Sequence, residues 1–175
     1  ATDTVTITIN GTNDAPTVDA SVASAFTEDA NASAQDLSQA GTVSFDDIDA
    51  NDVVDISATL TTGAVWSGGT IDAGLAAALE AGFTASATDA AAPGSVAWNY
   101  AVNDANLDFL KAGESISLTF TVTATDSANA TATDTVTITI NGTNDAPTAD
   151  ASGASPFTAD ANGSAQDPSQ AGTVS

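Results

Sequence analysis

The chain contains no cysteine, methionine or histidine, and Lys111 is the only basic residue among its 175 positions. Without cysteine there is no disulfide framework and no thiol nucleophile. Without histidine, the side chain used most often for proton transfer near neutral pH is missing. The sequence also lacks a glycine-rich phosphate loop and a Gly-x-Ser-x-Gly nucleophile motif. We therefore expect a protein that is not an enzyme.

Positive charge is almost absent, since 23 acidic residues face one lysine and the net charge is −22. Nucleic acids and anionic membrane surfaces would repel such a chain, so neither is an expected partner. No apolar run reaches the roughly 18 residues that a membrane-spanning helix needs, and we expect no membrane insertion. Divalent cations or a salty medium would offset the repulsion among so many carboxylates.

A long internal repeat organises the sequence. Residues 1–17 return unchanged at 132–148, and 18–44 return at 149–175 with six changes in 27 positions. The period of 131 residues is the size of a domain and too long for a solenoid unit. The chain is expected to hold three parts of a tandem array: the final strand and linker of a preceding repeat at 1–17, one complete repeat at 18–148, and the first segment of a following repeat at 149–175.

The sequence pattern is typical of short β-strands. Thr-Val-Thr-Ile-Thr-Ile, at 4–9 and again at 135–140, alternates β-branched apolar and polar residues as a half-buried strand does. A second long strand at 115–125 would form a hairpin with 132–140. Shorter strands are expected at 41–45, 53–60 and 96–102, and one short helix at 72–82.

These elements predict an all-β fold, an immunoglobulin-like antiparallel β-sandwich with one short helix. The residues expected in its core are Trp98, Tyr100, Leu107, Leu110 and Phe120. An aromatic stripe would alternatively offer a platform for sugar stacking, but aromatics make up only 5% of the sequence.

Three aspartates in the stretch Phe45–Asp52 suggest a metal site. Asp47 and Asp49 are two residues apart, so they point the same way on an extended chain, and a turn can return Asp52 to them. Converging carboxylates without a cationic partner repel one another. Oxygen ligands without histidine or cysteine select a hard ion, and Ca²⁺ takes 6–8 such oxygens. The alternative is a solvated acidic loop.

Three strings occur in an order that resembles the VCBS repeat: GTVSFDDIDANDVV at 41–54, LDFLKAGESISLTFTVTATD at 107–126 and DTVTITINGTNDAP at 134–147. That family occurs in very large secreted bacterial proteins, notably RTX-type adhesins, and its domains are similar to cadherins in fold. The resemblance implies a cadherin-like sandwich on the bacterial cell surface. It also implies calcium between consecutive domains, held by the linker and by both neighbours.

The resemblance further implies two sets of calcium ligands. At the C-terminal junction they are Glu28, Glu114, Asn144 and Asp145. At the N-terminal junction they are Asn13, Asp14, Asp47, Asp49 and Asp126. Ala159 stands where the following repeat would place the counterpart of Glu28, so that ligand is missing from the next copy.

The function expected first is a structural spacer in a giant adhesin, stiffened by calcium at its linkers and supporting cell adhesion and biofilm formation. Its partners would be neighbouring repeats and possible further copies of the chain. Two alternatives stay open. One is a glycan-binding module in which Trp66 is the candidate contact. The other is an extracellular fibre subunit, in which the strand at 1–9 of one chain is donated to another.

Overall fold

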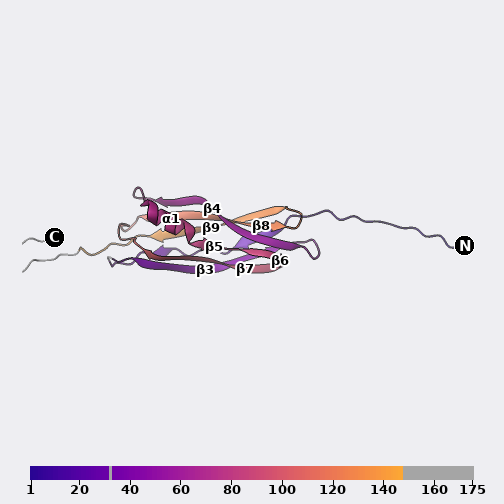
Figure 1. Cartoon of the computed structure of the whole chain (residues 1–175), viewed down its shortest axis with the longest axis horizontal. Helices are drawn as coiled ribbons and strands as arrows, with labels where there is room; N and C mark the ends of the chain where they lie inside the picture. The colour runs from indigo at the N-terminus through magenta and orange to yellow at the C-terminus, as the bar shows by residue number, and fades with distance from the viewer. Residues whose placement is uncertain (32, 148–175) are drawn as a thin grey trace, which may run out of the picture. The chain divides into compact units, whose positions relative to one another are not determined.

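Alternating β-branched and polar residues fold into two packed β-sheets in the computed structural model (Figure 1). The structure describes residues 1–31 and 33–147. The chain divides into two units, Ala1–Asp145 and Ala146–Ser175, and the sheets belong to the first. The segment expected to begin a following repeat, 149–175 with Ala159, lies outside the described residues. The elements in chain order are β1 (Thr17–Ala20), β2 (Phe26–Thr27), β3 (Gln35–Asp46), β4 (Val53–Trp66), α1 (Ala73–Ala81), β5 (Phe83–Thr84), β6 (Ala87–Ala91), β7 (Gly94–Ala105), β8 (Ser115–Asp126) and β9 (Thr131–Asn141).

One sheet has the strand order β1-β3-β7-β5 and the other has the order β2-β9-β8-β4-β6. All pairings are antiparallel except that of the two-residue strand β2 with the end of β9, which is parallel. Apolar residues from both sheets form one buried cluster between them. The predicted all-β sandwich is therefore confirmed, and so is the hairpin of β8 and β9.

The core follows the period-2 pattern of the long strands. In β8, Ile116, Leu118, Phe120 and Val122 are buried and alternate with serine and threonine. All five predicted core residues are buried. Phe83 lies against two of them, with ring centroids 5.6 Å from Trp98 and 4.5 Å from Phe120.

The helix and the other predicted strands lie where the sequence places them, whereas the run at 4–9 does not form a strand. Helix α1 begins after Asp72, whose carboxylate accepts hydrogen bonds from the backbone N–H groups of Gly74 and Leu75, a standard N-cap. Strands β3, β4 and β7 contain the predicted runs and extend beyond them. The short strands β1, β2, β5 and β6 were not predicted. Within the described residues there is no helix with the length and apolar character to span a membrane.

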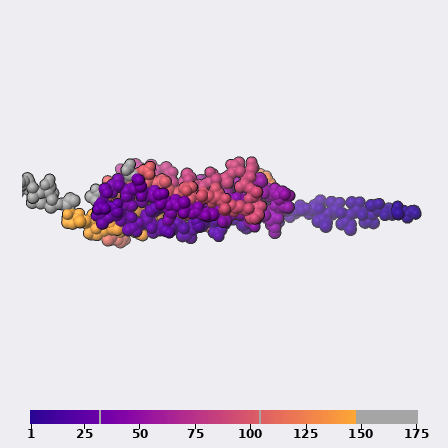
Figure 2. Space-filling view, turned by 90° about the horizontal axis from the view of Figure 1, so that it is seen from below, coloured from indigo at the N-terminus to yellow at the C-terminus, as the bar shows by residue number. Residues whose placement is uncertain are grey.

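The predicted strand at 4–9 is wrong, because residues 1–16 belong to no strand. Figure 2 shows no other described segment packed against the first residues of the chain, drawn in indigo. Val5, Ile7 and Ile9 are 86%, 83% and 92% exposed. The same six residues at 135–140 lie in β9, where all three aliphatic side chains are 0% exposed. The difference is the partner strand: residues 131–141 pair with β8, and no described strand pairs with the first copy.

The two copies offer a matched pair of substitutions for testing the packing. Ile138→Ala should lower the free energy of unfolding by about 2–5 kcal/mol, because it leaves a cavity in a filled core. Ile7→Ala, the same change in the same local sequence, should change it by less than about 0.5 kcal/mol, because the side chain is exposed. Denaturant unfolding of both variants measures the difference, and equal effects would contradict the assignment of β9.

Candidate metal centres

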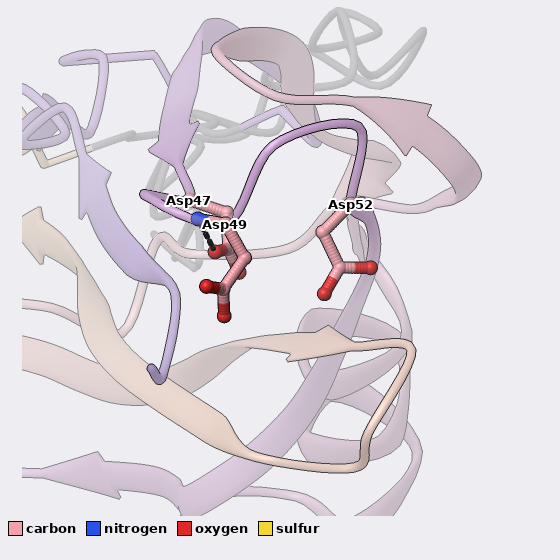
Figure 3. Close-up of side chains that lie close together, drawn as sticks. All are labelled: Asp47, Asp49 and Asp52. Atoms are coloured by element: carbon pink, nitrogen blue, oxygen red, sulfur yellow. Dashed lines mark hydrogen bonds between the residues drawn. The ribbon is translucent and has the colours of Figure 1, made fainter. Parts of the chain in front are cut away.

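The loop between β3 and β4 brings together the three aspartates that the sequence singled out. Asp47, Asp49 and Asp52 each offer a carboxylate oxygen within 4.8 Å of the others, and Figure 3 shows the three side chains projecting from one loop. The Asp52 N–H donates to the carbonyl of Asp49 over 3.2 Å. Asn51, inside this turn, has a φ of 67°, a left-handed conformation that asparagine tolerates. The predicted turn therefore does return Asp52 to the other two.

Hydrogen bonds within the loop fix the aspartates but leave one oxygen without a partner. Asp47 Oδ1 accepts from the Asp49 N–H over 2.9 Å, whereas Asp47 Oδ2 is buried with no hydrogen-bond partner. A hydrogen bond from the Ser127 side chain, with a further one from the Val53 N–H, lowers the pKa of Asp52. Asp52 is therefore ionised at neutral pH, and the loop presents negative charge at its open side.

The N-terminal linker lies against this loop. The Asp14 N–H donates to Asp49 Oδ2 and the Asn13 side-chain amide donates to Asp126 Oδ2, each over 2.8 Å. Pro16 is buried at the start of the sandwich. The linker is thus docked on the carboxylates through its own N–H groups, and a cavity of about 380 Å³ lies beside it, lined in part by Asp14 and Asp47.

Asp126 has a role in the hairpin as well. It is 5% exposed, and its Oδ1 accepts from the N–H groups of Ala128 and Ala130 over 2.9 and 2.7 Å. This oxygen closes the turn between β8 and β9, while Oδ2 faces Asn13. The structure therefore joins Asp126 to the linker, next to the three-aspartate loop, through a hydrogen bond.

Glu28 occupies the opposite end of the sandwich, where β9 ends. Its side chain is 2% exposed, and Oε2 accepts from the N–H and the hydroxyl of Thr143 over 2.9 and 2.6 Å. Its Oε1 is buried and has no hydrogen-bond partner. A buried carboxylate oxygen without a partner is costly, and this one lies beside the second copy of the linker.

Asp145 of that linker faces the same place. Its Oδ1 is also buried without a partner. Desolvation raises the pKa of Asp145, and the negative charges of Glu28, Asp108 and Asp29 raise it further. The four carboxylates therefore form a group in which each ionised member disfavours ionisation of Asp145.

Asp29 and Asp108 were missed by the sequence reasoning. Asp29 directly follows Glu28, which is a usable signal, but Asp108 lies in the loop between β7 and β8, far from both in sequence. Only the packing of that loop beside the end of β9 brings it to Asp145.

The side chain of Glu114 contacts Trp66 and the backbone of Lys111. Its Oε2 accepts from the indole N–H of Trp66 and from the Lys111 N–H, each over 3.2 Å. The Trp66 ring also packs edge-on against Phe109, with ring centroids 4.8 Å apart. Both polar and apolar parts of Trp66 are thus engaged within the sandwich, and the carboxylate of Glu114 supports the indole.

The two linker copies share one local geometry. The Asn13 amide donates to the Asp14 carbonyl over 2.9 Å, and the Asn144 amide donates to the Asp145 carbonyl over 3.0 Å. The same hydrogen bond therefore forms in both copies of the linker. The first copy shows what the linker touches in the sandwich that follows it, and the second shows what it touches in the sandwich that precedes it.

The donor set at both ends fits a hard divalent cation. All the oxygens belong to carboxylate, amide, hydroxyl or carbonyl groups, which are the ligands of Ca²⁺. The unpartnered oxygens of Asp47, Glu28 and Asp145 are unexplained by the protein's own hydrogen bonds. Asp47, Asp49 and Asp52 would hold one ion, and Glu28 and Asp145, with Asp29 and Asp108 beside them, would hold another. A bound cation would supply the positive charge that offsets this repulsion.

Comparisons with known proteins identify no family for this chain. No protein-family model matches the chain, and no curated protein matches it. Among solved structures, the chain is similar to the CooA pilin subunit from enterotoxigenic Escherichia coli, with 13% sequence identity over 61% of this chain and 80% of that chain and a TM-score of 0.31. A similarity at this TM-score carries no argument about fold or function.

Repulsion among the carboxylates around Asp145 should lower the stability of the folded chain when a chelator removes divalent cations. Because its pKa is raised in the folded chain, ionisation costs stability as the pH rises above the ordinary value of about 3.9. Asp145→Asn should therefore raise Tm at pH 7 in chelator and have little effect near pH 3. Thermal unfolding across this range measures the difference. Asp19→Asn, an exposed change on β1, is the control, and an equal effect of both variants would contradict the grouping.

Proposed function

We propose that the chain is a non-catalytic spacer from a tandem array on a bacterial cell surface, stiffened by calcium at its linkers. The observation that carries this proposal is the docking of the repeated linker at both ends of the sandwich. Thr143 of one copy is bonded to Glu28, and Asn13 and Asp14 of the other copy are bonded to Asp126 and Asp49. Such contacts suit a part whose role is to fix one domain against the next.

The repeat shows how few residues of the linker separate its contact with one sandwich from its contact with the next. Asn13 is the counterpart of Asn144, which directly follows Thr143, because the period is 131 residues. In an array, a residue held by the preceding sandwich would thus be followed at once by residues held by the next one. No free residue would separate the two attachments, which supports a stiff spacer over a flexible tether.

Calcium would strengthen both attachments. Asp47, Asp49 and Asp52 lie in one loop of the sandwich, against which the linker docks through the Asp14 N–H. Glu28 of the sandwich and Asp145 of the linker would share an ion only when the two are folded together. An ion that binds the folded chain alone stabilises it by RT ln(1 + [Ca²⁺]/Kd), or about 2.7 kcal/mol at one hundred times Kd. The same ion would remove the repulsion around Asp145.

Calcium should raise Tm, and chelation should lower it and make an array of several repeats more flexible. Asp49→Asn should reduce the calcium-dependent rise because it removes a ligand from the three-aspartate loop, whereas Asp19→Asn should leave the rise unchanged. Thermal unfolding and small-angle scattering, each with calcium and with chelator, measure these effects. Identical melting and scattering profiles in the two conditions would sink the calcium-stiffened spacer.

A fibre subunit joined by strand donation is a second proposal, favoured by the exposed apolar residues at 5, 7 and 9. The glycan-binding alternative rests on Trp66. Its test is glycan-array binding that Trp66→Ala abolishes without unfolding the chain, and the contacts of Trp66 with Glu114 and Phe109 make folding of that variant the necessary control.

A further inference from the structure

The position of β9 in its sheet is defined by three sets of contacts. Along β8 it pairs antiparallel from Ser115↔Asn141 to Thr125↔Thr131, with Leu118 opposite Ile138. At its end it pairs in parallel with β2, where Phe26 lies opposite Ile140. Near its start, Asp134 Oδ2 accepts from the Ala20 N–H over 2.8 Å. Any strand that takes this position must supply aliphatic residues at three alternate places and an aspartate two places before the first.

Residues 3–10 meet each of these requirements, because 1–17 and 132–148 are identical. Asp3 corresponds to Asp134, and Val5, Ile7 and Ile9 correspond to the three buried aliphatic residues of β9. Those side chains are more than four-fifths exposed in the first copy. The described residues thus carry two copies of one strand, and the sandwich that they form has one place for them.

The first copy cannot reach that place in its own sandwich while β1 stays paired. Ile9 would lie where Ile140 lies, nine residues along β9 from Thr131, or about 31 Å away. Ala20 is level with Asp134 and Phe26 is level with Ile140, so the chain advances along β9 in the direction of β9 from β1 to β2. Thr17, three residues before Ala20, therefore lies near the level of Thr131. The eight residues from Ile9 to Thr17 span at most about 29 Å when fully extended, and they must also cross between sheets.

We propose that residues 3–10 enter the β9 position of a second copy of this chain and displace its residues 134–141. The interface is the β8–β9 ladder already present in the structure, made between two chains in place of within one. The displaced strand has the same sequence as the entering one, so it can enter a third copy. This exchange would join chains side by side through their sandwiches; it rests on the fibre-subunit proposal and not on the calcium-stiffened spacer.

The exchange leaves the number and kind of strand contacts unchanged, because the entering residues 3–10 have the same sequence as the released residues 134–141. Its extent is therefore set by the chain concentration relative to the effective concentration of the tethered β9. A short tether gives an effective concentration of the order of millimolar. At about 0.1 mM chain, exchanged molecules should then be on the order of one tenth of the total after unfolding and refolding, and their share should rise with concentration.

Because the chain has no cysteine, two introduced cysteines can trap the exchanged form. Thr119 and Thr137 face each other across the ladder with their hydroxyl oxygens 3.1 Å apart. Thr6 is the counterpart of Thr137, so the double variant Thr6→Cys with Thr119→Cys should form disulfide-linked dimers and longer species after refolding under mild oxidation. Non-reducing electrophoresis at several chain concentrations measures them.

Matched variants separate register-specific exchange from chance collision. Thr6→Cys with Thr123→Cys is out of register, because Thr123 pairs with Thr133, and it should give at least several-fold less dimer. Adding Ile7→Asp to the in-register pair should abolish trapping, since Ile7 must be buried. Adding Thr4→Asp, the counterpart of exposed Thr135, should leave it intact. Equal trapping in and out of register, or no effect of Ile7→Asp, would overturn the proposal.

A second measurement needs no cysteine. After refolding at high concentration, sedimentation of the unmodified chain and of Thr4→Asp should show a dimer that Ile7→Asp lacks. The variant Thr119→Cys with Thr137→Cys should close a disulfide within one chain and shows whether the site accepts the bond. Monomer alone in sedimentation, together with no trapped dimer, would show that the strand does not exchange.

Discussion

The sandwich depends on the backbone ladder of β8, which pairs along its length with β4 on one side and β9 on the other. Its alternate residues Ile116, Leu118, Phe120 and Val122 also form part of the core. A strand is stable where a neighbour satisfies its N–H and C=O groups and covers its apolar face. The presence of β8 makes residues 131–141 a strand. The copy of 132–141 at the N-terminus has no such neighbour among the described residues, and its aliphatic side chains are exposed.

Charge imposes the second constraint. With one lysine in the chain, carboxylates cannot be compensated by ion pairs, and the structure compensates many of them with backbone N–H groups. Asp126, Asp72 and Asp134 accept such bonds in a turn, a helix cap and a strand contact. The oxygens left over, on Asp47, Glu28 and Asp145, lie where the linker meets the sandwich. Folding and linker docking are therefore aspects of one electrostatic arrangement, which the proposed cation would complete.

Local spacing accounts for the part of the candidate site that could be predicted. Asp47, Asp49 and Asp52 lie within six residues, so a strand end and one turn are enough to gather them. The group at the other end draws on residues far apart in the chain, and Asp108 gave no signal in the sequence. Glu114 lies directly before β8, and its Oε2 accepts a hydrogen bond from the indole N–H of Trp66, a contact that the sequence did not indicate. Ligand sets built from distant segments depend on loop packing, which spacing does not describe.

The sequence by itself determined the alternation of apolar and polar residues in the long strands, the core residues, the short helix and the Asn-to-Asp hydrogen bond that both linker copies share. These features depend on interactions between neighbouring residues or on burial of one face. The tertiary structure decided which copy of Thr-Val-Thr-Ile-Thr-Ile becomes β9 and which carboxylates meet. Two identical sequences cannot differ in propensity, so the outcome rests on the partner strand that each one finds.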